Sequence, residues 1–118
     1  MVTQGELEKM VVKLEKAGQD WVKAKLAAEQ LEEDAKPYLA SLENELESKG
    51  ESGESKLERL AKGSPQFRKY IQEMCFARAE SLKMKVRYEG FQALFEARRS
   101  EYALERVKLE KGVTHLGG

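Results

Sequence analysis

Apolar residues recur at a spacing of seven along the N-terminal part of the chain. One series begins at Leu7, and a second series, beginning at Met10, follows three residues behind the first. Apolar residues at the first and fourth places of a seven-residue repeat, positions a and d, are typical of a helix that packs lengthwise against another long helix. The a positions are Leu7, Leu14, Trp21, Ala28, Ala35 and Leu42, and the d positions are Met10, Ala17, Ala24, Leu31 and Tyr38.

The start of this segment, Thr3-Gln4-Gly5-Glu6, has the form of a capping box, in which two side chains satisfy free backbone N–H groups. We therefore predict a helix over residues 4–47. Pro37 falls inside it, and proline removes one backbone hydrogen bond and crowds the preceding turn. Because Tyr38 and Leu42 keep the phase of the earlier repeat, the pattern favours a kink near Pro37 over a break.

The next stretch, residues 48–55, contains two glycines, three serines and no apolar residue, which predicts a surface loop. Ser55 and Glu58 then repeat the spacing of a capping box. A short helix is expected over residues 56–62, and Gly63 is expected to end it.

Ser64 and Pro65 open the C-terminal half with an N-cap serine followed by proline at the first helical position. The seven-residue repeat returns and predicts a long helix over residues 65–111, followed by a loose tail over residues 112–118, because Gly112 favours a helix end. In this helix the a positions are Phe67, Met74, Ser81, Tyr88, Phe95, Tyr102 and Leu109, and the d positions are Tyr70, Ala77, Met84 and Phe91.

The aromatic a and d positions of the second long helix complement the alanines of the first, because large side chains opposite small ones pack without voids. The predicted fold class is therefore all-α: two long antiparallel helices, forming a helical hairpin or coiled coil, with a short connecting helix. With 118 residues, of which 36% are charged, the chain is expected to be a single helical domain.

A second apolar line runs along the other side of the long C-terminal helix. A two-helix hairpin would leave this line in water, and a helix that is apolar on two sides is usually buried on two sides. We therefore predict a homodimer, with two hairpins forming a dimeric bundle along this line. The expected interface residues are Cys75, Ala79, Leu82, Val86, Ala93, Ala97 and Leu104.

The charges are balanced overall, with 21 basic and 21 acidic side chains, but they are unevenly distributed. Residues 1–48 carry 6 basic against 11 acidic side chains, and residues 65–118 carry 11 against 7. We interpret this as an acidic helix packed against a basic one, with ion pairs at the rim. The alternative is a basic face that contacts DNA or RNA. Its candidate contacts are Lys83, Lys85, Arg87, Arg98, Arg99 and Arg106.

Signals for chemistry are weak throughout the sequence. Cys75 has no neighbouring histidine that would activate it, and His115 is the single histidine. The sequence contains no phosphate-binding glycine loop and no nucleophile elbow. We therefore expect no enzyme activity, no cofactor and no metal. One cysteine, no apolar run of signal-peptide length and no membrane span favour a cytoplasmic protein without a membrane partner.

The C-terminal half resembles a known group of proteins. Ser64-Pro65, Tyr88-Glu89 and the segment Glu96-Ala97-Arg98-Arg99-Ser100 are similar to small, all-helical hypothetical proteins of tailed bacteriophages and prophages. The resemblance brings no functional residue with it. It implies a phage-encoded accessory protein in the cytoplasm of a bacterial host. We predict a non-catalytic helical protein that binds a host or phage protein, for example as an inhibitor of host defence; the alternative is a nucleic-acid-binding factor in phage DNA metabolism.

Overall fold

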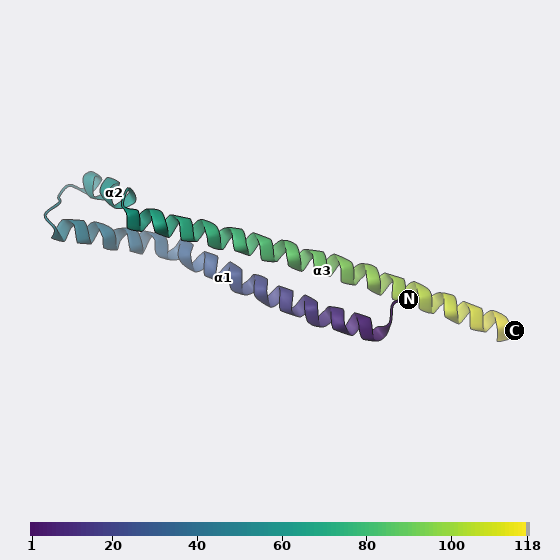
Figure 1. Cartoon of the computed structure of the whole chain (residues 1–118). Coiled ribbons are helices and arrows are strands. Elements are labelled where there is room, and N and C mark those ends of the chain that lie inside the picture. The colour runs from purple at the N-terminus through teal and green to yellow at the C-terminus, as the bar shows by residue number, and fades with distance from the viewer. Residues whose placement is uncertain (118) are drawn as a thin grey trace. The chain divides into compact units, whose positions relative to one another are not determined.

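The computed structural model describes the backbone of residues 1–117 and the side chains of residues 1–112. It contains three helices: α1 (Gln4–Ser48), α2 (Glu54–Lys62) and α3 (Pro65–Gly117) (Figure 1). No strand occurs within residues 1–117, so the predicted all-α class is confirmed. Pro37 lies inside α1 without ending it, which confirms that the helix is not broken there.

The chain divides into two compact units, and each unit takes a part of α1 and a part of α3. The terminal unit consists of Met1–Trp21 with Lys83–Gly118. The middle unit is Val22–Leu82, which includes α2. The two units are described separately below.

The first turn of α1 forms the Thr3 half of the predicted capping box. The Thr3 hydroxyl oxygen accepts a hydrogen bond from the backbone N–H of Glu6, with a distance of 3.1 Å between nitrogen and oxygen. Val2 precedes the cap and only 6% of it is exposed. An apolar residue before the cap commonly packs on the residue five positions later, here Leu7, as a hydrophobic staple. Val2 belongs to the small core of the terminal unit, which the repeat did not predict because Val2 lies outside the helix.

At its other end α1 closes with two backbone bonds that define a Schellman motif. The N–H of Glu51 donates to the carbonyl of Leu46 at 3.1 Å, and the N–H of Gly50 donates to that of Glu47 at 3.0 Å. Gly50 has φ 100°, a left-handed conformation that glycine adopts without steric cost. The predicted loop is therefore shorter than expected and lies between Ser48 and Glu54.

The short helix α2 begins earlier than predicted. Its N-cap is Gly53, with φ 94° and no side-chain cap hydrogen bond, and the N–H of Leu57 donates to the Gly53 carbonyl at 2.9 Å. The predicted capping box at Ser55 and Glu58 is therefore wrong. Glycine at residue 53 gives the chain the positive φ that lets the helix start at Glu54, so Ser55 already lies in the first turn.

α3 begins at the predicted cap but extends beyond the predicted end. The Ser64 hydroxyl oxygen accepts from the N–H of Phe67 at 3.2 Å and donates to the Ala61 carbonyl at 2.7 Å, which links α2 to α3. The helix continues through Gly112 to Gly117, so the predicted tail is wrong for residues 112–117; residue 118 lies outside the described residues. A glycine inside a helix costs only about 1 kcal/mol, and no proline follows Gly112 to enforce an end.

The predicted a and d positions are buried or half-buried in both long helices, with one exception. Every one of them in α1 is buried or half-buried, and the same is true in α3 for all except Leu109, of which 59% is exposed. Leu109 is exposed because it lies beyond the part of α3 that α1 can cover. Gly18 lies opposite Tyr88 in the terminal unit, and the antiparallel course of the two segments leaves no α1 residue opposite a position three heptads further along α3.

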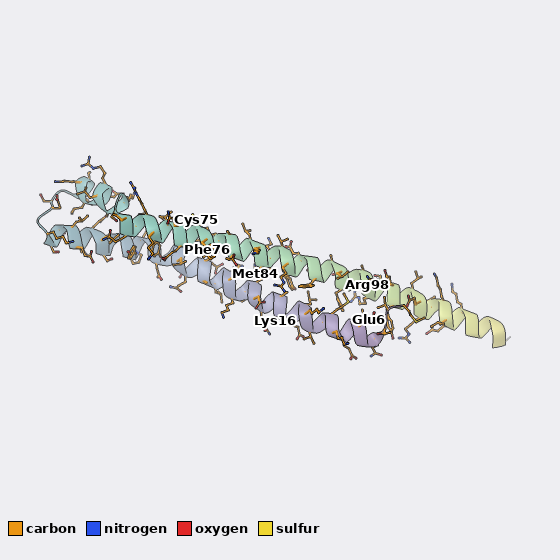
Figure 2. All side chains as sticks on the ribbon, in the orientation of Figure 1. Glu6, Lys16, Cys75, Phe76, Met84 and Arg98 are labelled. Carbon is orange, nitrogen blue, oxygen red and sulfur yellow. The ribbon has the colours of Figure 1, made fainter. Side chains whose placement is uncertain are left out.

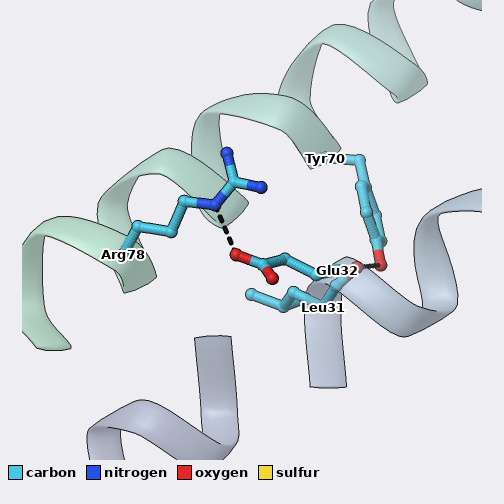
Figure 3. A network of polar contacts seen from close by, with 4 residues as sticks. All are labelled: Leu31, Glu32, Tyr70 and Arg78. Carbon is cyan, nitrogen blue, oxygen red and sulfur yellow. Dashed lines mark hydrogen bonds and ion pairs between the residues drawn. The ribbon is translucent and has the colours of Figure 1, made fainter. Parts of the chain in front are cut away.

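Within the middle unit, α1 and α3 run antiparallel. The rings of Tyr38 and Tyr70 stack with centroids 4.8 Å apart, and the Tyr70 hydroxyl donates to the Leu31 carbonyl at 2.5 Å. Glu32 of α1 and Arg78 of α3 form an ion pair at 2.5 Å (Figure 3). Lower numbers in α1 therefore meet higher numbers in α3. Met74, 9% exposed, and Leu42, 6% exposed, are the large apolar side chains of this unit's core.

In the terminal unit an aromatic ring of α3 contacts both a large and a small residue of α1. Trp21 and Tyr88 contact each other with ring centroids 5.5 Å apart, and the Tyr88 ring also lies against Gly18. Ala17 is 3% exposed beside them. In this layer Tyr88 contacts the large Trp21 and the small Gly18, so the predicted partner of the ring, an alanine at position a or d, is replaced by these two residues. Glycine, rather than alanine, is the residue that admits the tyrosine.

Candidate functional site

All seven predicted interface residues are exposed. In the middle unit these are Cys75, Ala79 and Leu82, and Leu82 is 64% exposed. In the terminal unit, 69% of Val86 and 56% of Leu104 are exposed, and the remaining two, Ala93 and Ala97, are exposed as well. Figure 2 labels Cys75 on α3. Neither α1 nor α2 covers this line, so it is free to contact another molecule.

The line has a different period from the a and d positions, and this divides it. Its members recur on average every 3.6 residues, the period of a straight helix, whereas the a and d positions recur every 3.5. In the middle unit Cys75 and Leu82 occupy heptad position b, on the flank that carries Arg78. In the terminal unit Ala97 and Leu104 occupy position c, on the flank that carries Arg87. The line therefore forms one apolar face in each unit.

Several exposed apolar side chains lie outside the predicted line. Phe76 is the most prominent of these on α3, with 68% of its surface exposed, and Figure 2 labels it beside Cys75. On α1, Val22 is 54% and Leu26 is 59% exposed in the middle unit, and Val12 is 65% exposed in the terminal unit. The sequence could have identified these residues, because they are large apolar residues outside positions a and d. Such residues are not needed for the pairing of α1 with α3.

A groove opens between α1 and α3 in the middle unit. Its floor consists of Ala28 and Ser81, two a positions that are both small, so no large side chain fills the space between the helices. The volume is about 290 Å³. The groove is lined by Lys25, Ala28, Glu29, Arg78, Ser81 and Leu82. The large-against-small rule predicted from the sequence fails at this layer.

The six candidate nucleic-acid contacts are exposed, but five of them are held by neighbours in their own helix. Lys85, Arg98 and Arg106 pair with Glu89, Glu101 and Glu110 at 3.9, 3.0 and 3.8 Å. The guanidinium groups of Arg87, Arg99 and Arg106 lie over the rings of Phe91, Phe95 and Tyr102, between 5.6 and 6.0 Å from their centroids. Lys83 has no such partner. Arg87, Arg99 and Arg106 thus cover ring faces of the aromatic a and d residues of α3, a packing role that competes with contact to a polyanion.

The predicted ion pairs between an acidic α1 and a basic α3 are few. Among the described side chains the ion pair that joins the two helices is Glu32 with Arg78, and the hydrogen bond that Arg78 donates to the Glu32 carboxylate raises the pKa of Arg78. Most other pairs join residues three or four positions apart in one helix. The opposite net charges of α1 and α3 are therefore mostly not matched by ion pairs between the two helices.

Burial raises the pKa of the Tyr70 phenol, and the nearby carboxylates of Asp34 and Glu73 raise it further. The protonated hydroxyl of Tyr70 donates a hydrogen bond to the carbonyl of Leu31, and this bond joins α3 to α1 (Figure 3). Among the described residues, no three side chains of histidine, cysteine, aspartate or glutamate come together as a metal site. The side chain of His115 lies outside the described residues.

Comparison of the chain with protein-family models, with curated proteins and with solved structures finds no match. Within the described residues, no helix combines the length and the apolar character that crossing a bilayer requires.

Proposed function

We propose that this chain is a non-catalytic helical hairpin that self-associates and acts by binding another protein. One observation carries the proposal: large apolar side chains stand exposed on faces of the helices that take no part in the pairing of α1 with α3. Exposed apolar side chains that gather on one face of a helix mark sites of contact with another protein. The resemblance to helical proteins of tailed phages supports a role as a phage-encoded accessory protein whose target is a host or phage protein.

Self-association is the part of this proposal that can be tested without knowing the target. Leu82 and Val86 are 64% and 69% exposed, so replacing both with glutamate removes apolar surface without opening a core. Gel filtration with light scattering should give twice the 13.4 kDa of one chain for the wild type and a single chain for the double variant. A wild-type monomer would contradict the proposal. A double variant that remains dimeric would place the interface on another face.

The alternative function, contact with DNA or RNA through the basic residues of α3, has one supporting observation. In the terminal unit Arg87 and Phe91 line a groove of about 270 Å³ together with Lys13, Lys16, Ala17 and Asp20, so three cations meet one carboxylate there. Nucleic-acid binding that depends on phosphate contacts weakens steeply as salt rises from about 50 to 200 mM. The absence of any shift of single- or double-stranded DNA at low salt would exclude this function.

A further inference from the structure

We propose that the middle unit carries a self-complementary contact face, and that its occupant is the same face of a second copy of this chain. The face combines the groove over Ala28 and Ser81 with the exposed apolar side chains beside it, Leu82 and Val22. This inference rests on the proposed self-association and assigns it to a particular surface. That surface includes α1, which the apolar line of α3 does not.

The first reason is that cavity and projection lie on one face. The groove has an apolar floor and a volume of about 290 Å³, far more than the roughly 30 Å³ of one water molecule. Leu82, 64% exposed, stands on its α3 rim. Val22 lies one heptad before the rim residue Glu29, on the same side of α1. A two-fold contact requires that each copy present both a projection and a cavity on the same patch, and this face does so.

The second reason is the charge on the rim. Lys25 pairs with Glu29 at 4.0 Å along α1, and Arg78 pairs with Glu32 across the two helices. Lys25, Glu29 and Arg78 line the groove, and Glu32 lies beside it through its bond with Arg78, so two positive and two negative groups balance there. A second copy meets no repulsion there, and each cation can also face a carboxylate of the partner copy. A strongly acidic or strongly basic partner finds no matching charge on this rim.

The third reason is the amount of exposed surface. The chain exposes 9091 Å². A globular monomer of 13.4 kDa exposes roughly 6,500 Å², so about 2,600 Å² lies above the expected value. A standard protein interface needs about 800 Å² from each partner. The exposed surface of the chain therefore exceeds what one standard contact requires.

The test uses the full chain and four variants checked for unchanged helicity by circular dichroism. Val22→Glu and Leu82→Glu place a charge on the proposed face. Phe76→Glu is the matched control, because Phe76 is as exposed as Leu82 and lies in the same unit but at heptad position c, on the other flank of α3. Leu104→Glu is the control in the terminal unit.

Light scattering on the five proteins should give monomers for Val22→Glu and Leu82→Glu and dimers for the wild type and both controls. A dimeric wild type with a dimeric Val22→Glu variant would overturn this inference and leave the proposed self-association intact. A wild-type monomer would overturn both. Dissociation by Leu82→Glu and Leu104→Glu without dissociation by Val22→Glu would favour the apolar line of α3 and also overturn this inference.

Cys75 supplies an independent readout, because it is the one cysteine of the chain, is exposed, and lies one heptad before Leu82 on the same flank. Its reaction with a thiol reagent should slow several-fold as the wild-type concentration rises between about 1 and 100 µM, a range that covers moderate dissociation constants. In Val22→Glu the rate should stay independent of concentration. A wild-type rate that does not change with concentration, in a protein shown to be dimeric, would overturn the assignment of this face.

Discussion

Gly18 of α1 lies against the Tyr88 ring of α3 in the terminal unit, and this contact gives a quantitative test of the pairing of the helices. A Cβ atom added at Gly18 would lie 3.2 Å from Cε2 of the Tyr88 ring. The same ring contacts Trp21, with ring centroids 5.5 Å apart. Gly90 is the matched control, because it also lies inside a helix of the terminal unit and a Cβ added there meets nothing within 4 Å.

Replacing glycine by alanine inside a helix stabilises it by about 1 kcal/mol when space allows. For 118 residues the entropy of unfolding at the midpoint is about 0.25 kcal/mol per degree, so this gain raises Tm by about 4 °C. We expect that rise for Gly90→Ala. At Gly18 the ring of Tyr88 must move against Trp21 to admit the methyl group, which cancels the gain, so Gly18→Ala should leave Tm unchanged or lower it.

Thermal unfolding followed by circular dichroism measures both variants. The difference between them isolates the contact, because the helix propensity term is the same in each. A Gly18→Ala variant that is stabilised as much as Gly90→Ala would refute the register of α1 on α3 in this unit.

Three further perturbations test the contacts of the middle unit. Ser64→Ala removes the cap of α3 and should lower stability by about 1 kcal/mol in thermal unfolding, whereas Ser55→Ala, at a serine that caps nothing, should be nearly neutral; equal effects would contradict the assigned caps. Tyr70→Phe should cost about 1 kcal/mol at pH 7 through the lost hydrogen bond to the helix. Burial raises the pKa of Tyr70 above its ordinary 10.0, so the contribution of Tyr70 to the free energy of unfolding is complete below pH 10.0 and is lost as the pH rises through the raised pKa. The difference in stability between wild type and Tyr70→Phe should therefore shrink in alkali. A difference that stays constant with pH would contradict this role. A double-mutant cycle on Arg78 and Glu32 should give a coupling of at most about 1 kcal/mol that falls with salt, and a larger coupling insensitive to salt would contradict an exposed pair.

The seven-residue repeat predicted the helices and their contact residues because both depend on periodicity alone. Leu7, Leu14 and Trp21 in α1, and Tyr88 and Phe95 in α3, lie where their phase placed them. The errors fell at positions where a single local conformation decides the outcome. Gly53, rather than Ser55, is the N-cap of α2, because the positive φ of this glycine lets the helix begin at Glu54. Gly112 does not stop α3, since its cost is small against the continuing backbone bonds of the helix.

The candidate surface was predictable in part. The exposure of Leu82 and Val86 follows from their positions outside the a and d series. The groove was not predictable, because it depends on Ala28 and Ser81 meeting in the same layer, and two separate periodic patterns do not fix which layers pair. The packing of Arg87 on Phe91 and of Arg99 on Phe95 was not predictable either. A list of basic residues does not distinguish a side chain that packs on an aromatic ring from one that is free.

Sedimentation equilibrium of the full chain tests the central claim most directly. The claim is that the exposed apolar surface is a contact surface, so the protein should sediment at twice 13.4 kDa at high concentration and dissociate on dilution. The range from about 1 to 100 µM covers the affinities expected of an interface of standard size. A single species of 13.4 kDa at every concentration in that range would contradict the account.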